Sequence, residues 1–439
     1  MSEERVGIEE FDFLIRNCTV LPIPGQIIEN GMIGVDGNRI SYVGKVKKGA
    51  KGETEVDGEN MIAMPGLINC HTHVPMTIFR GVAEDKNAGD WFNEIIWPLE
   101  EKLSPDDIYW GTLLGCLEMI RSGTTCFSDM YYMEDKVARA VEGIGIRGVL
   151  ALGVIENGDK KRGEQGLKAG IDFIRKYNKS ANGRIRTWLG PHAPYTVSPE
   201  LLKRFREEAD RLGVGLHIHL AELLDMKKLV KDKYGTSPVR FLDSLGFLKG
   251  DVLAAHCIHI SDEELKILVR RDVKIAYNPI SNMKIAAGIA RIYDLLKSGA
   301  IVGIGTDSAA SNNSLDMFQT MKFAALLQKI NYMNPEILPI DEILGMATIG
   351  GARALGLEKE IGSLQVGKIA DIILVNTRKP HLTPSNNHKA NLVYSANGAD
   401  IDTVIIDGRI VMINRQVTTV DEEEVMQRAS RTIGNLLSD

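Results

Sequence analysis

The sequence predicts an α/β protein, a (β/α)8 barrel joined to a small composite β-sandwich domain. Three observations support this fold class. The middle of the 439-residue chain alternates short apolar strands with capped helices, which is typical of a parallel sheet. Eight such strands suit a (β/α)8 barrel of ~250 residues or more, whereas a doubly wound open sheet does not need eight. Both ends of the chain are instead rich in strand and turn signals.

Barrel strands are expected where apolar runs of strand length stand between helix signals. They cover residues 61–67, 124–128, 149–154, 185–189, 214–220, 252–255, 273–277 and 301–304. One helix between them should begin after the N-cap Ser198, with Pro199 in its first turn, and end before Gly213. Another should begin with the capping box formed by Ser261 and Glu264.

The two ends of the chain are expected to combine into one β domain. Short strands bounded by turn signals are predicted at 13–16, 32–35, 369–375, 403–406 and 409–413. A surface helix capped by Asp421 should follow over 422–437. We therefore expect β-sandwich parts at 1–64 and 369–439, with the barrel inserted over 65–368.

Composition excludes several classes of protein. Hydrophobic residues make up 44% and charged residues 25%, so the chain is not mainly disordered. A net charge of −6 favours neither nucleic acid nor an anionic membrane as partner. The five scattered cysteines argue against a disulfide framework or a thiolate zinc site. The acidic start and the absence of a long apolar run predict a cytoplasmic protein without a signal peptide.

Seven of the nine histidines stand near the ends of expected barrel strands. They are His71, His73, His192, His217, His219, His256 and His259. Asp307 follows the eighth expected strand. Because the carboxyl ends of barrel strands converge on one face, imidazoles and a carboxylate there would meet in one site. Such a donor set suits a borderline metal ion, above all zinc.

Each of these residues has an ordinary alternative. His71 and His73 point to one face of a strand, but they could be a hydrogen-bonded turn pair. His256 could be a buried core histidine, and Asp307 could cap a turn. Glu222 is placed to meet a metal-bound water without being a ligand, but it could open a surface loop. These alternatives weaken together, because four strand ends each supply a residue type that one metal site needs.

Taken as an ordered set, these motifs resemble the amidohydrolase superfamily. The matching segments are PGLINCHTH (65–73), HIHLAE (217–222), AAHCIH (254–259) and GTDSAASNNS (305–314). Within it, the chain resembles 5-methylthioadenosine/S-adenosylhomocysteine deaminases and archaeal 5′-deoxyadenosine deaminases. That narrower likeness rests on Trp91, WPLEEKL (97–103), GPHAPY (190–195) and NPISNMK (278–284). The resemblance implies a metal-dependent hydrolase barrel and a homo-oligomer.

The resemblance also implies a metal site and a hydrolytic deamination. One zinc ion, or Fe²⁺ or Mn²⁺ in its place, would be bound by His71, His73, His219 and Asp307. No lysine stands at the end of the fourth strand to bridge a second ion. Water would attack C6 of an adenine nucleoside, giving an inosine-type product and ammonia. Glu222 would protonate the neighbouring ring nitrogen and His256 would stabilise the new oxygen. Asp307 would carry the water proton to the departing ammonia.

The resemblance assigns the substrate contacts as well. Glu100 would bind the ribose 2′- and 3′-hydroxyls, and His192 would contact the nucleoside. Trp91 would form a wall near the 5′ substituent, although it could be a plain core or interface aromatic. Of two arginines that hold a homocysteine carboxylate in such enzymes, one position is Leu152 here and the other falls at Arg162. Neutral 5′ groups are therefore expected to be relatively favoured.

Three other functions were weighed against this one. A guanine deaminase or a triazine-type chlorohydrolase would share the metal ligands and differ in the substrate contacts. A non-catalytic scaffold relative would have lost ligands, whereas the chain keeps all four. Deamination of nucleic acid is disfavoured, because the chain has neither the HxE and PCxxC signature nor a basic groove. The expected partner is a small nucleoside, with no nucleic acid and no membrane.

Overall fold

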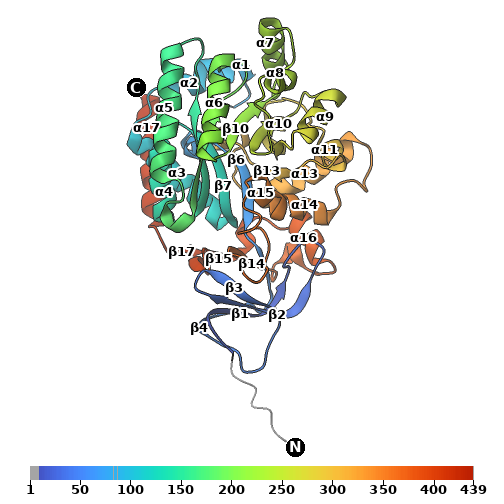
Figure 1. The fold of residues 1–439 in the computed structure, drawn as a ribbon. Helices are drawn as coiled ribbons and strands as arrows, with labels where there is room; N and C mark the ends of the chain where they lie inside the picture. Colours follow the sequence, from blue (N-terminus) through green and yellow to red (C-terminus); the bar gives the residue numbers. More distant parts are fainter. Residues whose placement is uncertain (1–8, 83, 87, 439) are drawn as a thin grey trace, which may run out of the picture.

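The computed structural model describes residues 9–82, 84–86 and 88–438, so the first eight residues of the acidic start lie outside it. The described chain forms an eight-stranded parallel barrel above a nine-stranded mixed sheet (Figure 1). The predicted fold class, a barrel with a small β domain added, is therefore confirmed. None of the described helices is long and apolar enough to cross a membrane.

The barrel strands pair in chain order, and every pair is parallel. They are β6 (Leu67–Thr72), β7 (Thr124–Tyr131), β8 (Arg147–Val154), β9 (Ile185–Pro191), β10 (Leu216–Leu220), β11 (Val252–His256), β12 (Lys274–Tyr277) and β13 (Val302–Ile304). β13 also lies beside β6, so the sheet curls into a nearly closed barrel. An open doubly wound sheet would leave its first and last strands apart, and that alternative is excluded.

Helices cover the outside of the barrel (Figure 1). They are α3 (Pro105–Arg121), α4 (Glu134–Ile144), α5 (Lys160–Tyr177), α6 (Pro199–Leu212), α9 (Asp262–Arg270), α11 (Ile292–Lys297), α13 (Met317–Asn331) and α14 (Ile340–Ala347). The short helix α15 (Ile349–Ala354) instead packs against residues at the amino ends of the barrel strands, such as Ile68 and Cys70. The predicted caps are confirmed. The Ser198 hydroxyl accepts the Leu201 N–H at the start of α6, and Gly213 ends that helix in the left-handed conformation. Both bonds of the Ser261 capping box are present on α9.

Further helices lie in the segments that follow the carboxyl ends of the strands. They are the 3-10 helix η1 (Val74–Phe79), α1 (Ala88–Asp90), the π-helix η2 (Trp91–Ile96), α2 (Trp97–Glu100), α7 (Leu224–Tyr234), α8 (Pro238–Ser244), α10 (Pro279–Lys284) and α12 (Ala309–Asn312). α7 and α8 stand at the end of the barrel farthest from the mixed sheet (Figure 1). These segments form the rim around the candidate site.

The second sheet joins the two ends of the chain. Its order is β17-β16-β15-β14-β5-β1-β2-β3, and β4 pairs with β1. The strands are β1 (Glu10–Val20), β2 (Ile28–Asp36), β3 (Arg39–Lys45), β4 (Lys51–Asp57), β5 (Met61–Pro65), β14 (Ile372–Asn376), β15 (Ile401–Ile406), β16 (Arg409–Ile413) and β17 (Gln416–Val417). The expected sandwich is thus one mixed sheet linked throughout by hydrogen bonds. The domain boundaries expected at 64/65 and 368/369 stay a prediction.

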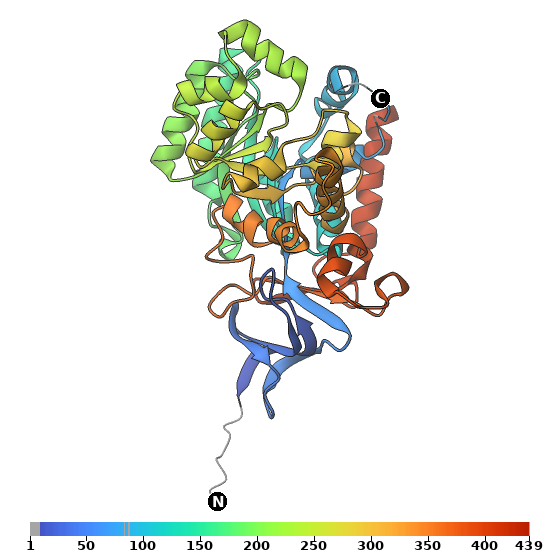
Figure 2. The ribbon, with the colours of Figure 1, turned by 90° about the vertical axis from the view of Figure 1, so that its right-hand side faces the viewer.

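The remaining short helices are η3 (Ala181–Gly183), η4 (Pro380–Leu382), α16 (His388–Tyr394) and η5 (Gly398–Asp400). The C-terminal helix α17 (Glu422–Ser438) runs along the side of the barrel, red in Figure 2, and lies against α3. Its predicted cap is confirmed, because the Asp421 carboxylate accepts the N–H groups of Glu423 and Glu424.

One strand assignment was wrong. The apolar run at 61–67 was expected to open the barrel, but β5 belongs to the mixed sheet and the barrel begins at Leu67. The chain changes sheets at Gly66, where a Cβ atom would lie 2.0 Å from the Thr125 hydroxyl oxygen. Hydrophobicity continues across this change, because both sheets bury the segment. The shift places His71 within β6 rather than after the strand.

A buried ion pair ties the two sheets together. Arg147, the first residue of β8, donates from Nε and Nη2 to the two carboxylate oxygens of Asp371 at 2.9 and 3.1 Å. Both side chains are 2% exposed. The Asp407 carboxylate lies 3.7 Å from the same guanidinium. The mixed sheet is therefore attached to the amino ends of the barrel strands, and the carboxyl ends stay free for a site.

We predict that Asp371→Ala strongly destabilises the fold. Removing the carboxylate leaves Arg147 charged, buried and without its bidentate partner, which costs about 3–5 kcal/mol in comparable cases. Urea unfolding of the full chain measures the change in midpoint. Asp172→Ala is the control, because its ion pair with Lys168 is exposed and should leave the midpoint unchanged. Equal midpoints for both variants would contradict the role given to the pair.

Candidate active site

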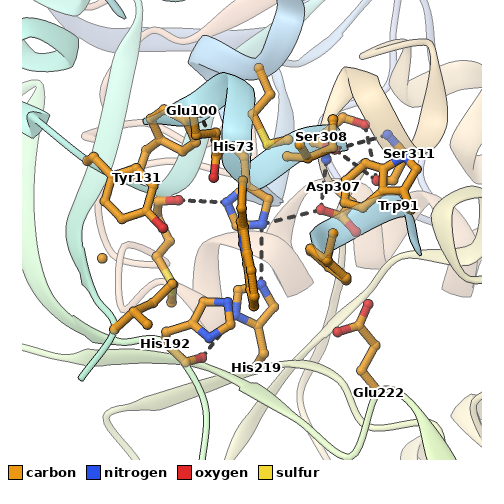
Figure 3. Close-up of a pocket in the computed structure, with 18 of the residues that line it drawn as sticks. His73, Trp91, Glu100, Tyr131, His192, His219, Glu222, Asp307, Ser308 and Ser311 are labelled. Atoms are coloured by element: carbon orange, nitrogen blue, oxygen red, sulfur yellow. Dashed lines mark hydrogen bonds and ion pairs between the residues drawn. The ribbon is translucent and has the colours of Figure 1, made fainter. Parts of the chain in front are cut away.

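A pocket opens at the carboxyl ends of the barrel strands, and the predicted site residues gather in it (Figure 3). Aromatic and apolar side chains line it together with a few polar and acidic ones, which is typical of small-molecule sites. The lining residues predicted from sequence are His73, Trp91, Glu100, His192, His219, Glu222, His256 and Asp307. In Figure 3, Glu100 and Glu222 lie on opposite sides of the His73 imidazole.

Four predicted metal ligands converge at the base of this pocket. His73 Nε2 lies 3.2 Å from His219 Nε2 and 3.4 Å from Asp307 Oδ1. His71 Nε2 lies 3.6 Å from Asp307 Oδ1. Donors about 2.1 Å from one ion at tetrahedral angles are about 3.4 Å apart, so these separations suit a single divalent metal ion. His71 Nε2 is also buried without a hydrogen-bond partner, as expected of a ligand atom.

The opposite nitrogen of each imidazole is already hydrogen-bonded. The Nδ1 bonds are His71 to His217 Nε2 (2.8 Å), His73 to the Met130 carbonyl (2.6 Å) and His219 to the His192 carbonyl (2.9 Å). A carbonyl accepts only from Nδ1–H, which leaves Nε2 unprotonated on the side of the site. Outer contacts of this kind orient metal-binding imidazoles and select their tautomer.

The environment favours the neutral form of four histidines in and beside the cluster. Burial, followed by repulsion from neighbouring imidazoles, lowers the pKa of His71 and His219 well below the usual value. Burial also lowers the pKa of His192 and His217 to about 3. Neutral imidazole is the form that binds metal, so the cluster is prepared for an ion at neutral pH.

Unusual backbone conformations aim the candidate catalytic side chains. His256 has φ +74° and Asp307 has φ +65°, and Ala221, just before Glu222, has φ +51°. Non-glycine residues in this left-handed region cost about 1–3 kcal/mol each and persist where the surroundings enforce them. The three residues close three different barrel strands, so the strain is concentrated at the mouth of the barrel.

The side chains of Glu222 and His256 lie close together in the pocket. His256 Nε2 lies 3.7 Å from Glu222 Oε1 and 3.8 Å from Asp307 Oδ2. The His256 Nδ1 contacts the side-chain oxygen of Asn282 at 2.8 Å. Burial raises the pKa of Glu222, although attraction to His256 opposes it. Glu222 is thus shifted toward the protonated form that a general acid needs.

Hydrogen bonds hold the carboxylate of Asp307 from both sides. Its Oδ1 accepts the Ser308 N–H at 2.7 Å, and its Oδ2 accepts the Ser281 hydroxyl at 2.7 Å. Ser281 lies on α10 and is buried. The two oxygens therefore have fixed directions, one toward the histidine pair and the other toward His256.

Of the residues expected to contact the substrate, Glu100, His192 and Trp91 line the pocket and Arg162 does not. Glu100 accepts the Tyr131 hydroxyl at 2.6 Å. Burial raises the pKa of Glu100 to about 7, against the stabilising effects of Tyr131 and His73. Trp91 is buried in the pocket wall. Arg162, in contrast, is exposed on α5 and does not line the pocket.

Sequence reasoning missed several residues of the site. The π-helix η2 brings Phe92 and Ile96 to the pocket beside Trp91, and Trp97, the first residue of α2, lines the pocket as well. A π turn stacks residues about five positions apart, so the 3.6-residue period of an α-helix does not reveal this face. His217 was expected at the site without a role, and it supports His71 instead.

The chain belongs to the amidohydrolase family, whose family model matches residues 62–411. It is 48% identical over 427 residues to a 5-methylthioadenosine/S-adenosylhomocysteine deaminase of Desulforudis audaxviator, covering 97% of this chain and 99% of the relative. It is 46% identical over 430 residues to a 5′-deoxyadenosine deaminase of Methanosarcina acetivorans, covering 97% and 99%. An adenosine deaminase from Xanthomonas campestris, solved with bound zinc, superposes with a TM-score of 0.94 at 30% identity, covering 98% and 100%.

We predict that His217→Leu weakens metal binding although it removes no ligand. Loss of an outer hydrogen bond to a ligand imidazole costs about 10–100-fold in metal affinity. Metal analysis after dialysis against graded chelator measures the effect. His259→Gln is the matched control, because His259 also lies at the barrel mouth but bonds the Ala287 carbonyl. Equal metal retention by His217→Leu and wild type would contradict the prediction.

Proposed function

We propose that this protein is a zinc-dependent hydrolase that deaminates adenosine-type nucleosides to inosine-type products and ammonia. The candidate substrates are 5′-deoxyadenosine, 5′-methylthioadenosine, S-adenosylhomocysteine and adenosine. One observation carries the proposal: three imidazoles and the Asp307 carboxylate converge beside Glu222, a carboxyl group whose pKa is raised by burial. The activities named for the two close relatives support the same reaction.

His71, His73, His219 and Asp307 would hold one metal ion. Zinc suits this set of three nitrogens and one carboxylate, and Fe²⁺ or Mn²⁺ can occupy such sites too. When bound, the ion supplies a Lewis acid that makes water nucleophilic near neutral pH. The zinc in the Xanthomonas campestris structure supports the choice of zinc.

Glu222 is the proposed general acid toward the adenine ring. Its carboxyl group accepts no hydrogen bond from the described residues, so it is open to a ligand. Burial favours the protonated carboxyl, which can donate to the ring nitrogen next to C6. Protonation there draws electrons from C6 and makes that carbon more open to attack by water.

His256 and Asp307 are proposed to manage the charge on the attacking oxygen and its proton. His256 can donate to that oxygen when Nε2 carries a proton, with Nδ1–H held by Asn282. Asp307 accepts the proton lost by water and delivers it to the departing ammonia. The hydrogen bonds from Ser281 and Ser308 keep the Asp307 carboxylate in place during both transfers.

The remaining pocket residues are proposed to bind the nucleoside. Glu100 would accept the two vicinal ribose hydroxyls, and His192 would contact the nucleoside near His219. Trp91 would form an apolar wall for the 5′ substituent. Leu152 is half-buried in β8 beside the lining residue Gly153 and offers no charge to a homocysteine carboxylate. Arg162, exposed on α5, remains the candidate for that contact.

Two rival functions remain to be separated by experiment. A guanine deaminase or triazine-type chlorohydrolase would use the same metal ligands but would not need a carboxylate for ribose. A scaffold relative would lack stoichiometric metal and activity. Metal analysis and ammonia release from adenosine analogues, guanine and a chlorotriazine distinguish all three. We keep a cytoplasmic location and a homo-oligomer as predictions from the sequence.

We predict that Glu222→Gln lowers kcat by at least about 10²–10⁴-fold on every nucleoside, because the amide cannot supply the proton. Metal content and the unfolding midpoint should stay at wild-type values. Glu207→Gln, on the exposed face of α6, is the control and should retain activity. Wild-type turnover by Glu222→Gln would rule out the assigned role.

We predict a preference for neutral 5′ substituents. Wild-type kcat/KM should be higher for 5′-deoxyadenosine and 5′-methylthioadenosine than for S-adenosylhomocysteine. Leu152→Arg should raise kcat/KM for S-adenosylhomocysteine, relative to kcat/KM for 5′-deoxyadenosine, by roughly 10–100-fold, because a charge-assisted contact is worth about 1.5–3 kcal/mol. Leu152→Met is the uncharged control. A clear wild-type preference for S-adenosylhomocysteine would overturn this expectation.

A further inference from the structure

Tyr131 links two parts of the pocket that come from different segments of the chain. It is the last residue of β7 and only 3% exposed. Its hydroxyl donates to Glu100 Oε1 at 2.6 Å, and Glu100 ends α2 on the rim. Among the described residues no other donor bonds the Glu100 carboxylate. Its second oxygen is therefore available to a ligand in the pocket.

The same strand end also holds a residue of the metal cluster. The carbonyl of Met130, the preceding residue, accepts the Nδ1–H of His73 at 2.6 Å. The rings of Tyr131 and His73 are 6.4 Å apart between centroids. Two consecutive residues of β7 thus bond a predicted metal ligand and the Glu100 carboxylate. The end of strand β7 therefore fixes the distance between the His73 imidazole and the Glu100 carboxylate.

The strand end itself is firmly anchored. The Tyr131 N–H donates to the buried carboxylate of Glu134 at 3.0 Å. Tyr131 is also paired with Leu152 in the ladder between β7 and β8. Burial raises the pKa of Tyr131 well above its usual value, so the phenol keeps the proton that it donates. A short hydrogen bond of this kind fixes the direction of the carboxyl group that accepts it.

We infer that Tyr131 is a positioning residue, which holds Glu100 at a set distance from the metal cluster so that ribose binding aligns the adenine C6. This inference rests on the proposed function. In a nucleoside the ribose hydroxyls and C6 are held apart by a nearly rigid framework. A carboxylate that binds those hydroxyls places C6 correctly only when the carboxylate itself is fixed. Misplacement by about 1 Å can cost 10²-fold in rate.

Tyr131→Phe tests the inference, because it keeps the ring and removes the donor. The full-length, metal-loaded variant is compared with wild type on 5′-deoxyadenosine and on 2′,3′,5′-trideoxyadenosine, which lacks both ribose hydroxyls. We expect kcat/KM for 5′-deoxyadenosine to fall about 10–100-fold, mostly in kcat. For the trideoxy analogue we expect a fall of less than about 3-fold, so discrimination between the two substrates shrinks.

Two further variants separate positioning from a general structural effect. Tyr277→Phe is the matched control, since Tyr277 is a buried tyrosine at the end of β12 whose hydroxyl bonds Gln328 outside the pocket. It should change kcat/KM by no more than about 3-fold for either substrate. Glu100→Gln combined with Tyr131→Phe should be little worse than Glu100→Gln alone, because Tyr131 acts through Glu100.

The inference is overturned if Tyr131→Phe lowers kcat/KM equally for both substrates, or if it leaves the ratio of the two kcat/KM values unchanged. It is also overturned if the effects of Glu100→Gln and Tyr131→Phe on kcat/KM multiply in the double variant. Metal content must be equal in all variants, so a loss of metal from Tyr131→Phe would also reject positioning in favour of a structural role. Failure of the proposed function gives a different result, because wild type would then turn over neither nucleoside.

Discussion

The hydrogen bonds behind the imidazoles are the constraint on which the site depends. With His73 and His219 held on Nδ1 by backbone carbonyls, their Nε2 atoms must face each other without protons. Burial favours the uncharged form of His71 and His219, so nitrogen lone pairs are concentrated in a space of low polarity. Such an arrangement is stabilised by a cation placed between the lone pairs. The proposed roles of Glu222 and Asp307 depend on their positions beside this arrangement.

The amino ends of the barrel strands anchor the fold, and the carboxyl ends hold the candidate site. At the amino ends of the strands, Arg147 and Asp371 join the barrel to the mixed sheet through a buried ion pair with two hydrogen bonds. At the carboxyl ends, His256 and Asp307 adopt left-handed backbone conformations that cost free energy. A well-anchored scaffold can support this local strain, which aims the side chains into the pocket. The same rigidity at the end of β7 would keep Glu100 and His73 in register.

The fold class and the gathering of histidines at the barrel mouth could be predicted from residue patterns, and the set of four metal ligands from the resemblance to the amidohydrolase superfamily. A period of two along a strand places His71 and His73 together, and the barrel brings distant strand ends to one face. The boundary at Gly66 was missed, because the apolar run crosses from one sheet to the next without interruption. The π-helix and the bond from Tyr131 to Glu100 were missed as well. A π-helix does not follow the 3.6-residue period of an α-helix, and the hydrogen bond joins residues 31 positions apart.

The central claim is that a metal-dependent attack of water on C6 takes place in this pocket. The most direct test incubates the metal-loaded protein with 5′-deoxyadenosine in water labelled with heavy oxygen. The account predicts one labelled oxygen at C6 of the 5′-deoxyinosine product, one equivalent of ammonia, and neither after treatment with chelator. Absence of ammonia, or a product without the label at C6, would contradict it.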